Sequence, residues 1–305
     1  MLVGLLNILI ILLAPFFMLG VIKKTKAFWA GRKGVSVFQP YWDFFRLMKK
    51  DAVYSKTTSW VFKFAPIIGL ATVVFASLFV PLVQGQAIIN LQFSFIIFAY
   101  ILGLGKFFAL LGALDTGSSF EGMGASREAC FSTIVEPAFF IAIASIAALS
   151  QNYTFESFKY ILDGAGVYGY LIIALAAITL FIMLLIEACR VPVDDPTTHL
   201  ELTMIHEVMI LDNSGVDLGL ITWTSAIKLF LFEALIANLI LPIGQSLPLS
   251  ILCFLGITFL VSVLIGTVES AIARFRMTHV FEFIFIMSLT ALLILALVTY
   301  RLYGN

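Results

Sequence analysis

Charged side chains are scarce in this sequence. Asp, Glu, Lys and Arg make up 12% of its 305 residues, whereas hydrophobic residues make up 61%. A soluble domain carries about 25% charged residues, so the composition excludes an ordinary soluble protein. It predicts a chain that crosses a lipid bilayer several times. The formal net charge is zero, and without a basic excess we expect no nucleic-acid partner.

Cysteine and histidine are equally rare, with three of each. The cysteines form no C-x-x-C pair, so the sequence offers no framework for zinc or for an iron–sulfur cluster. His199, His206 and Glu207 lie within one short stretch, but the H-E-x-x-H motif of a metal site is missing. No serine or cysteine stands beside a histidine in a nucleophile elbow. We therefore expect no metal, no cofactor and no catalytic residue in this chain.

Long apolar runs are what the sequence has in abundance. Eight of them reach about 20 residues, the length that spans a bilayer. They cover roughly residues 2–22, 61–83, 93–113, 131–150, 167–187, 222–242, 247–268 and 281–302. The first run lacks the basic start and the small-residue cleavage site of a signal peptide, so we expect a retained helix. With no internal repeat and no linker, residues 1–305 are predicted to form one all-α transmembrane domain.

Basic residues gather on one side of the predicted spans. Ten of the eighteen Lys and Arg residues lie between the first two spans, in segment 23–63. Later connections place five more on the same side: Lys106, Arg127, Arg190, Arg274 and Arg276. Loops rich in Lys and Arg stay in the cytoplasm. We therefore expect the long, charged loops after spans one, three, five and seven to be cytoplasmic and both termini to lie outside.

Two of these loops have distinctive sequences. The first, residues 23–60, contains FQPYWDFFRLMKK, in which aromatic and charged residues alternate as in an amphipathic helix on a membrane surface. The second, residues 188–221, is acidic and is interrupted at Pro192 and Pro196, which disfavour a continuous helix. A bland interpretation is a solvated connection between two spans. Carboxylates at a membrane face are costly unless they are solvated, paired or protonated, however, and this favours a functional role.

The stretch from 103 to 128 is rich in glycine. It matches no phosphate-binding loop, because neither GLGK nor GMGAS has the required spacing. We expect these glycines to allow close helix packing and tight turns at the membrane surface.

Ionisable residues inside or beside the apolar runs are the strongest functional signal. Burial favours the neutral form of a carboxyl group and a nearby cation favours the charged form, so a site with both can take up and release a proton. We predict a proton relay formed by Glu136, Glu187, Asp194, Glu201, Glu207, Lys228 and Glu233. The alternative is structural pairing, since Glu187 and Arg190 are three residues apart and could form a simple salt bridge.

Three motif blocks occur in order along the chain. The pattern G-x-x-G-x-x-x-x-Q falls on Gly31, Gly34 and Gln39. The pattern G-A-x-R-x-A, followed by an acid, falls on Gly124, Ala125, Arg127, Ala129 and Glu136. The pattern E-x-x-R-x-P-x-D, followed by Glu-Leu, falls on Glu187, Arg190, Pro192, Asp194, Glu201 and Leu202. Over roughly residues 20–280 the chain resembles the membrane subunit shared by respiratory complex I, where it is subunit 1 or H, and the energy-converting hydrogenases. The version in formate hydrogenlyase-type complexes is closer.

The resemblance implies an eight-helix subunit that anchors a cytoplasmic redox arm in a prokaryotic plasma membrane. It implies two kinds of partner: hydrogenase-like large and small subunits, which hold nickel–iron and iron–sulfur centres, and antiporter-like membrane subunits. This chain would be a non-catalytic subunit of an oxidoreductase complex that links electron transfer to proton or sodium translocation. Residues expected at docking surfaces are Gly31, Gly34, Gln39, Asp115, Arg127, Arg190, Arg274 and Arg276.

The sequence departs from the family pattern after Asp194. Thr197 and His199 stand where the family carries acids, which disfavours a quinone chamber of the complex I kind. Three alternatives stay open: a quinone-binding subunit of the complex I type, a stand-alone secondary transporter, and a purely structural anchor. A transporter usually shows inverted repeats and paired helix breaks, and the sequence shows neither.

Overall fold

The computed structural model of the chain describes residues 2–160, 166–195, 204–241 and 246–303. In these ranges all regular structure is helical, and eight helices are long and apolar enough to cross a membrane. The eight are α1 (Leu2–Trp29), α3 (Trp60–Ser77), α4 (Ser94–Asp115), α5 (Ser119–Ser150), α6 (Gly166–Glu187), α8 (Gly215–Ile240), α9 (Leu247–Ala271) and α10 (Met277–Tyr303). Shorter segments are α2 (Gln39–Met48), α7 (His206–Met209) and the 3₁₀ turns η1 (Val83–Gly85) and η2 (Phe155–Tyr160). The predicted all-α class and the eight predicted spans are confirmed.

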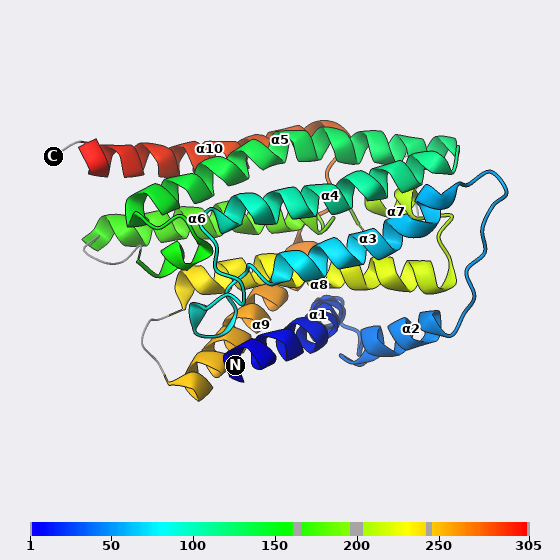
Figure 1. Cartoon of the computed structure of the whole chain (residues 1–305), viewed down its shortest axis with the longest axis horizontal. Helices are drawn as coiled ribbons and strands as arrows, with labels where there is room; N and C mark the ends of the chain where they lie inside the picture. The colour runs from blue at the N-terminus through cyan, green and yellow to red at the C-terminus, as the bar shows by residue number, and fades with distance from the viewer. Residues whose placement is uncertain (1, 161–165, 196–203, 242–245, 304–305) are drawn as a thin grey trace.

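The long helices form a bundle around α8. Figure 1 shows α4, α5, α6, α8 and α10 running side by side along the long axis, with α1 and α9 at one edge. Helix α8 packs against α1, α2, α3, α6 and α9, and its residues 226–239 are all buried except Lys228. Both termini lie toward the left of Figure 1, whereas the segments that carry α2 and α7 lie toward the right. Which of these ends faces the cytoplasm stays a prediction.

Helix α5 begins at Ser119, well before the predicted start at residue 131. Gly117, with φ of +72°, supplies the turn between α4 and α5, but Gly124 lies inside the helix. The reason is tertiary packing: a Cβ on Gly124 would lie 2.4 Å from Cγ1 of Val208 in α7, so only glycine allows this approach. The predicted close packing is therefore confirmed. The predicted boundary is wrong, because the helix continues through the glycines.

Helix α2 carries aromatic residues on two faces. Phe44 packs onto the bundle, with its ring centroid 5.2 Å from those of both Phe16 in α1 and Trp223 in α8. Trp42 and Phe45 of α2 are exposed, and so is Phe38, which directly precedes the helix. The predicted amphipathic helix is thus present, attached to the bundle through one face. Its place at the membrane surface stays a prediction.

Candidate functional site

Three charged side chains from three helices meet inside the bundle. Glu187 is the last residue of α6, Lys106 comes from α4 and Lys228 from α8. One Glu187 oxygen lies 2.7 Å from Nζ of Lys106, and the other lies 2.6 Å from Nζ of Lys228. The Glu187 residue is 7% exposed, so its negative charge is stabilised by two ammonium groups rather than by bulk water. The simple Glu187–Arg190 salt bridge considered from the sequence is not what the structure shows.

A second carboxylate, Glu128 of α5, joins this group. Its Oε1 lies 3.5 Å from Nζ of Lys106, so Lys106 lies between the acidic side chains of Glu187 and Glu128. Sequence reasoning missed Glu128 because α5 was expected to begin after it. The available signal was Lys106 itself, which needs a carboxylate partner when it is buried in an apolar helix.

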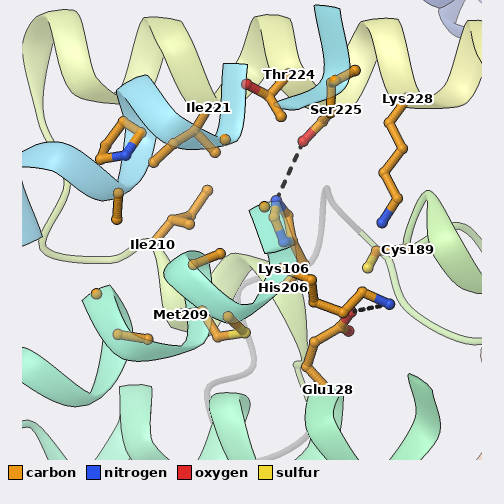
Figure 2. Close-up of a pocket in the computed structure, with 18 of the residues that line it drawn as sticks. Lys106, Glu128, Cys189, His206, Met209, Ile210, Ile221, Thr224, Ser225 and Lys228 are labelled. Atoms are coloured by element: carbon orange, nitrogen blue, oxygen red, sulfur yellow. Dashed lines mark hydrogen bonds and ion pairs between the residues drawn. The ribbon is translucent and has the colours of Figure 1, made fainter. Parts of the chain in front are cut away.

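These four side chains border a cavity of about 120 Å³ between α3, α4, α5, α7 and α8. A water molecule needs about 10–15 Å³ of such volume, so the cavity has room for several. Its walls are largely apolar, but Thr72, Cys189, His206 and Ser225 also face it. Figure 2 shows the ammonium groups of Lys106 and Lys228 pointing toward the same region, with the Cys189 sulfur between them in this view. The arrangement brings titratable groups and space for water together inside the bundle.

The segment after α6 closes one end of the cavity. His206 begins α7, and its Nε2 lies 3.4 Å from Oγ of Ser225 in α8. The backbone N–H groups of Ile205 and His206 each donate to Oδ2 of Asp194 at 3.0 Å. Asp194 is 1% exposed, so its carboxylate is fully engaged within the fold. The position of His206 on the cavity is therefore set by Asp194.

Cys189 lies just beyond the end of α6, with φ of +49°. Its thiol is buried, and burial, together with the nearby carboxylates of Glu128 and Asp194, raises its pKa well above the usual range for cysteine. A thiol in this state is a poor nucleophile. Its contribution to the cavity wall is a weak S–H donor.

The other predicted relay residues lie apart from this cluster. Glu233 is fully buried between α8 and α9, where its Oε1 accepts a hydrogen bond of 2.7 Å from Oγ of Ser262. Glu136 is exposed on α5, and Glu207 is half-buried in α7. Glu136, Glu207 and Glu233 do not line the cavity. Glu201 lies outside the described residues. Of the residues predicted for the proton relay, the structure thus brings together Glu187 and Lys228 but not the others that it describes.

A second group of charged side chains lies beside the end of α6. Glu269 of α9 lies 2.9 Å from Nζ of Lys26 in α1 and 3.5 Å from Nη1 of Arg190. The Glu269 side chain is fully buried. Because Arg190 follows α6 by only three residues, these two contacts hold the end of α6 against α1 and α9 and so support the position of Glu187.

Four residues predicted at docking surfaces have partners within the chain. Arg190 pairs with Glu269, and Arg274 lies 2.9 Å from Asp194. Arg127 donates to the Met204 carbonyl at 2.8 Å, and Asp115 accepts from the backbone N–H of Ser59 at 2.7 Å, next to the first turn of α3. These contacts show that the four residues shape the loops. Any contact with another subunit stays a prediction.

The remaining predicted docking residues lie nearer the surface. Gly31 and Gly34 are exposed and both have φ of +66°, a conformation that other residues rarely adopt. Gln39 donates to Oδ1 of Asp43 at 2.8 Å in the first turn of α2. Arg276 is exposed before α10. These positions are accessible to another subunit.

The NADH dehydrogenase family matches residues 2–300 of the chain. Hydrogenase-4 component C of Escherichia coli (strain K12) is 27% identical over 276 residues, which cover 88% of this chain and 86% of the relative. Formate hydrogenlyase subunit 4 of the same organism is 24% identical over 226 residues, which cover 74% and 73%. A chain of the membrane-bound sulfane sulfur reductase, an archaeal respiratory membrane complex, shares the fold with a TM-score of 0.80 and 19% identity, over 97% of this chain and 98% of that one. Matched along nearly its entire length, the chain belongs to the NADH dehydrogenase family.

Proposed function

We propose that the chain anchors and couples an energy-converting redox complex of the formate hydrogenlyase or membrane-bound hydrogenase type. In this role it links electron transfer in a docked cytoplasmic arm to the translocation of protons or sodium ions. The observation that carries the proposal is the Lys106–Glu187–Lys228 cluster beside a cavity that can hold water. The likeness to hydrogenase-4 component C and formate hydrogenlyase subunit 4 supports this setting.

The proposed partners are of two kinds, with different roles. Hydrogenase-like large and small subunits form the arm and hold the nickel–iron and iron–sulfur centres, while antiporter-like membrane subunits move the ions. The exposed Gly31, Gly34 and Arg276 offer contact points for the arm. We place this end of the bundle in the cytoplasm of a prokaryotic cell, because it carries the basic loops.

The geometry suggests how movement of the arm reaches the ion pairs. A subunit docked on the segment after α6 would pull on Asp194, which holds the backbone of His206, and on Arg190, three residues after Glu187 in the chain. A displacement of both lysines from Glu187 removes the attraction that keeps the carboxylate ionised. Glu187 then takes up a proton from water in the cavity, and it releases the proton when the lysines return.

Glu136 is the residue through which the proposed proton path would leave this chain for a neighbouring subunit. It is exposed in the middle of α5, a long helix that qualifies as a membrane span. A carboxylate that faces lipid is costly. We therefore expect an antiporter-like subunit to cover this part of α5 and the path to continue across that contact.

The test uses the purified complex in proteoliposomes, with electron transfer and ion movement measured together. Glu187→Gln keeps the size of the side chain but removes the charge shared by Lys106 and Lys228. We expect the complex to assemble and to transfer electrons, but to lose ion movement. Glu282→Gln, at an exposed position of α10, is the matched control. Full coupling in the Glu187→Gln complex would refute the proposal.

A purely structural anchor is the second candidate. It is favoured by the buried Asp194–Arg274 and Glu269–Lys26 pairs, which hold loops and helices together outside the cavity. Under this alternative, Glu187→Gln lowers the amount of assembled complex, and the complex that remains is fully coupled.

A further inference from the structure

Lys106 is the one member of the cluster that contacts two carboxylates. Its Nζ lies 2.7 Å from Glu187 in α6 and 3.5 Å from Glu128 in α5. The side chains of Lys106, Glu187 and Glu128 are 11%, 6% and 13% exposed. At this burial an ion pair is strongly favoured over separated charges. The shorter contact makes Glu187 the present partner of Lys106, with Glu128 within reach of a small movement.

The charges of the cluster allow this movement without leaving Glu187 alone. Glu187 keeps Lys228 on its other oxygen, at 2.6 Å. When Lys106 stays with Glu187, Glu128 has the weaker contact. When Lys106 moves to Glu128, both carboxylates have one ammonium group each. The two arrangements therefore differ mainly in how well the charge of Glu128 is compensated.

The surroundings of Glu128 are consistent with Lys106 as its controlling cation. From α4 it faces Lys106, and its charge acts on the thiol of Cys189, just beyond the end of α6. Glu187, the last residue of α6, lines the same cavity. The neighbouring Arg127 is directed elsewhere, to the Met204 carbonyl and the Met123 sulfur. His206 of α7 and Lys228 of α8 line the same cavity, and α3 contributes Thr72.

We propose that Lys106 exchanges between Glu187 and Glu128, and that Glu128 carries a proton in the first arrangement and releases it in the second. The step breaks the O–H bond of the Glu128 carboxyl group, passes the proton to water in the cavity and leaves an ion pair with Lys106. The reverse step takes a proton from that water. No other bond changes.

The exchange deepens the proposed function and rests on it. Glu128 and Glu136 lie on the same helix eight residues apart, which is about 12 Å along α5. Glu128 faces the cavity and Glu136 is exposed on the outside of the bundle. A proton released at Glu128 is thus already on the helix that leads to the outer carboxylate.

Glu128→Gln in the whole complex is the first test. We expect an assembled complex in which electron transfer continues and ion movement is lost. Infrared difference spectra between the oxidised and reduced complex should show a protonated-carboxyl band that Glu128→Gln removes and the Glu282→Gln control keeps. An unchanged band together with full coupling would overturn the exchange.

The double variant Lys106→Gln with Glu128→Gln separates exchange from simple pairing, and it also serves if the single variant fails to assemble. It removes both members of the proposed Lys106–Glu128 pair and leaves the Glu187–Lys228 pair intact. We expect it to assemble but to stay uncoupled. A structural role for the pair predicts restored coupling, and that result would refute the exchange.

Comparison with Glu187→Gln separates the two proposals. Loss of coupling in Glu187→Gln, with full coupling in Glu128→Gln, would refute the exchange and leave the proposed function standing. Full coupling in both variants would refute both.

Discussion

The carboxylate of Asp194 and the guanidinium of Arg274 meet at 2.9 Å and join the segment after α6 to the turn between α9 and α10. A backbone bond of 2.9 Å from Phe275 to the Pro192 carbonyl reinforces the same junction. The other Asp194 oxygen holds the first turn of α7. One buried side chain thereby joins the segment after α6, the first turn of α7 and the turn between α9 and α10.

Asp194→Asn tests this junction. The change removes the Asp194 charge that pairs with Arg274 and weakens the bonds to the N–H groups of Ile205 and His206. We expect a loss of about 3 kcal/mol in the free energy of unfolding, as for other broken buried pairs, and faster hydrogen exchange at those two amides. Asp212→Asn, at an exposed position close to α7, is the control and should change neither. Unaltered exchange at Ile205 and His206 would show that Asp194 does not hold α7.

A pair of glycine substitutions tests the packing of α5 on α7. Gly124→Ala would place a methyl group 2.4 Å from Val208 and 2.8 Å from the backbone oxygen of Ile205. We expect a loss of about 1–3 kcal/mol, typical of overpacking, seen as a lower melting temperature. Gly122→Ala has nothing within 4 Å and should be neutral or stabilising, because alanine favours a helix over glycine. Equal melting temperatures for both variants would contradict the close approach.

Two buried glutamates should respond differently to the same substitution. Glu187→Gln removes the partner of two lysines, and we expect it to destabilise the isolated chain by about 3 kcal/mol. In the assembled complex, contacts with the partner subunits offset this loss. Glu233 instead accepts one hydrogen bond from Ser262, and its other oxygen has no hydrogen-bond partner among the described residues. Glu233→Gln should therefore cost less than about 1 kcal/mol. Thermal unfolding of the two variants in detergent gives the comparison, and a larger loss for Glu233→Gln would be the contrary result.

The reaction of Cys189 with a maleimide should require a higher pH than that of an ordinary cysteine. Only the thiolate reacts with a maleimide, and the raised pKa of Cys189 means that the thiolate forms at higher pH than in an ordinary cysteine. In a variant with Cys130→Ser and Cys253→Ser, labelling should stay slow at neutral pH and increase only above the usual thiol pKa of about 8.5. The variant that keeps Cys130, which is exposed, provides the comparison. Equal pH profiles would show that the Cys189 thiol is not held in its neutral form.

The eight spans could be predicted from the sequence because a long apolar run is a local property of the chain. The content of the site could be predicted only in part. Glu187 and Lys228 stood out as charges in apolar helices, but the helices are apolar all round, so hydropathy does not show which way a side chain points. Glu233 is fully buried and Glu136 is exposed, although in the sequence both are single acids within an apolar run.

Glu128 shows a second limit of the sequence. Its place in the membrane domain depends on where α5 begins, and that start depends on Gly124 packing against Val208 of α7, about 80 residues later in the chain. A contact between such distant segments leaves no local pattern. The partners of Asp115, Arg127 and Arg274 were missed for the same reason.

The chain order of the four cluster residues has a consequence for biosynthesis. Lys106 and Glu128 lie on the consecutive spans α4 and α5, and Glu187 and Lys228 lie on the consecutive spans α6 and α8. Because the spans are synthesised in chain order, each lysine can pair with a carboxylate of the adjacent span early in insertion. Such pairing shortens the time for which a lysine or glutamate lies unpaired in lipid, where an isolated charge costs about 2.5–3.5 kcal/mol or more. Insertion can thus proceed hairpin by hairpin, and the central cluster closes when α8 arrives.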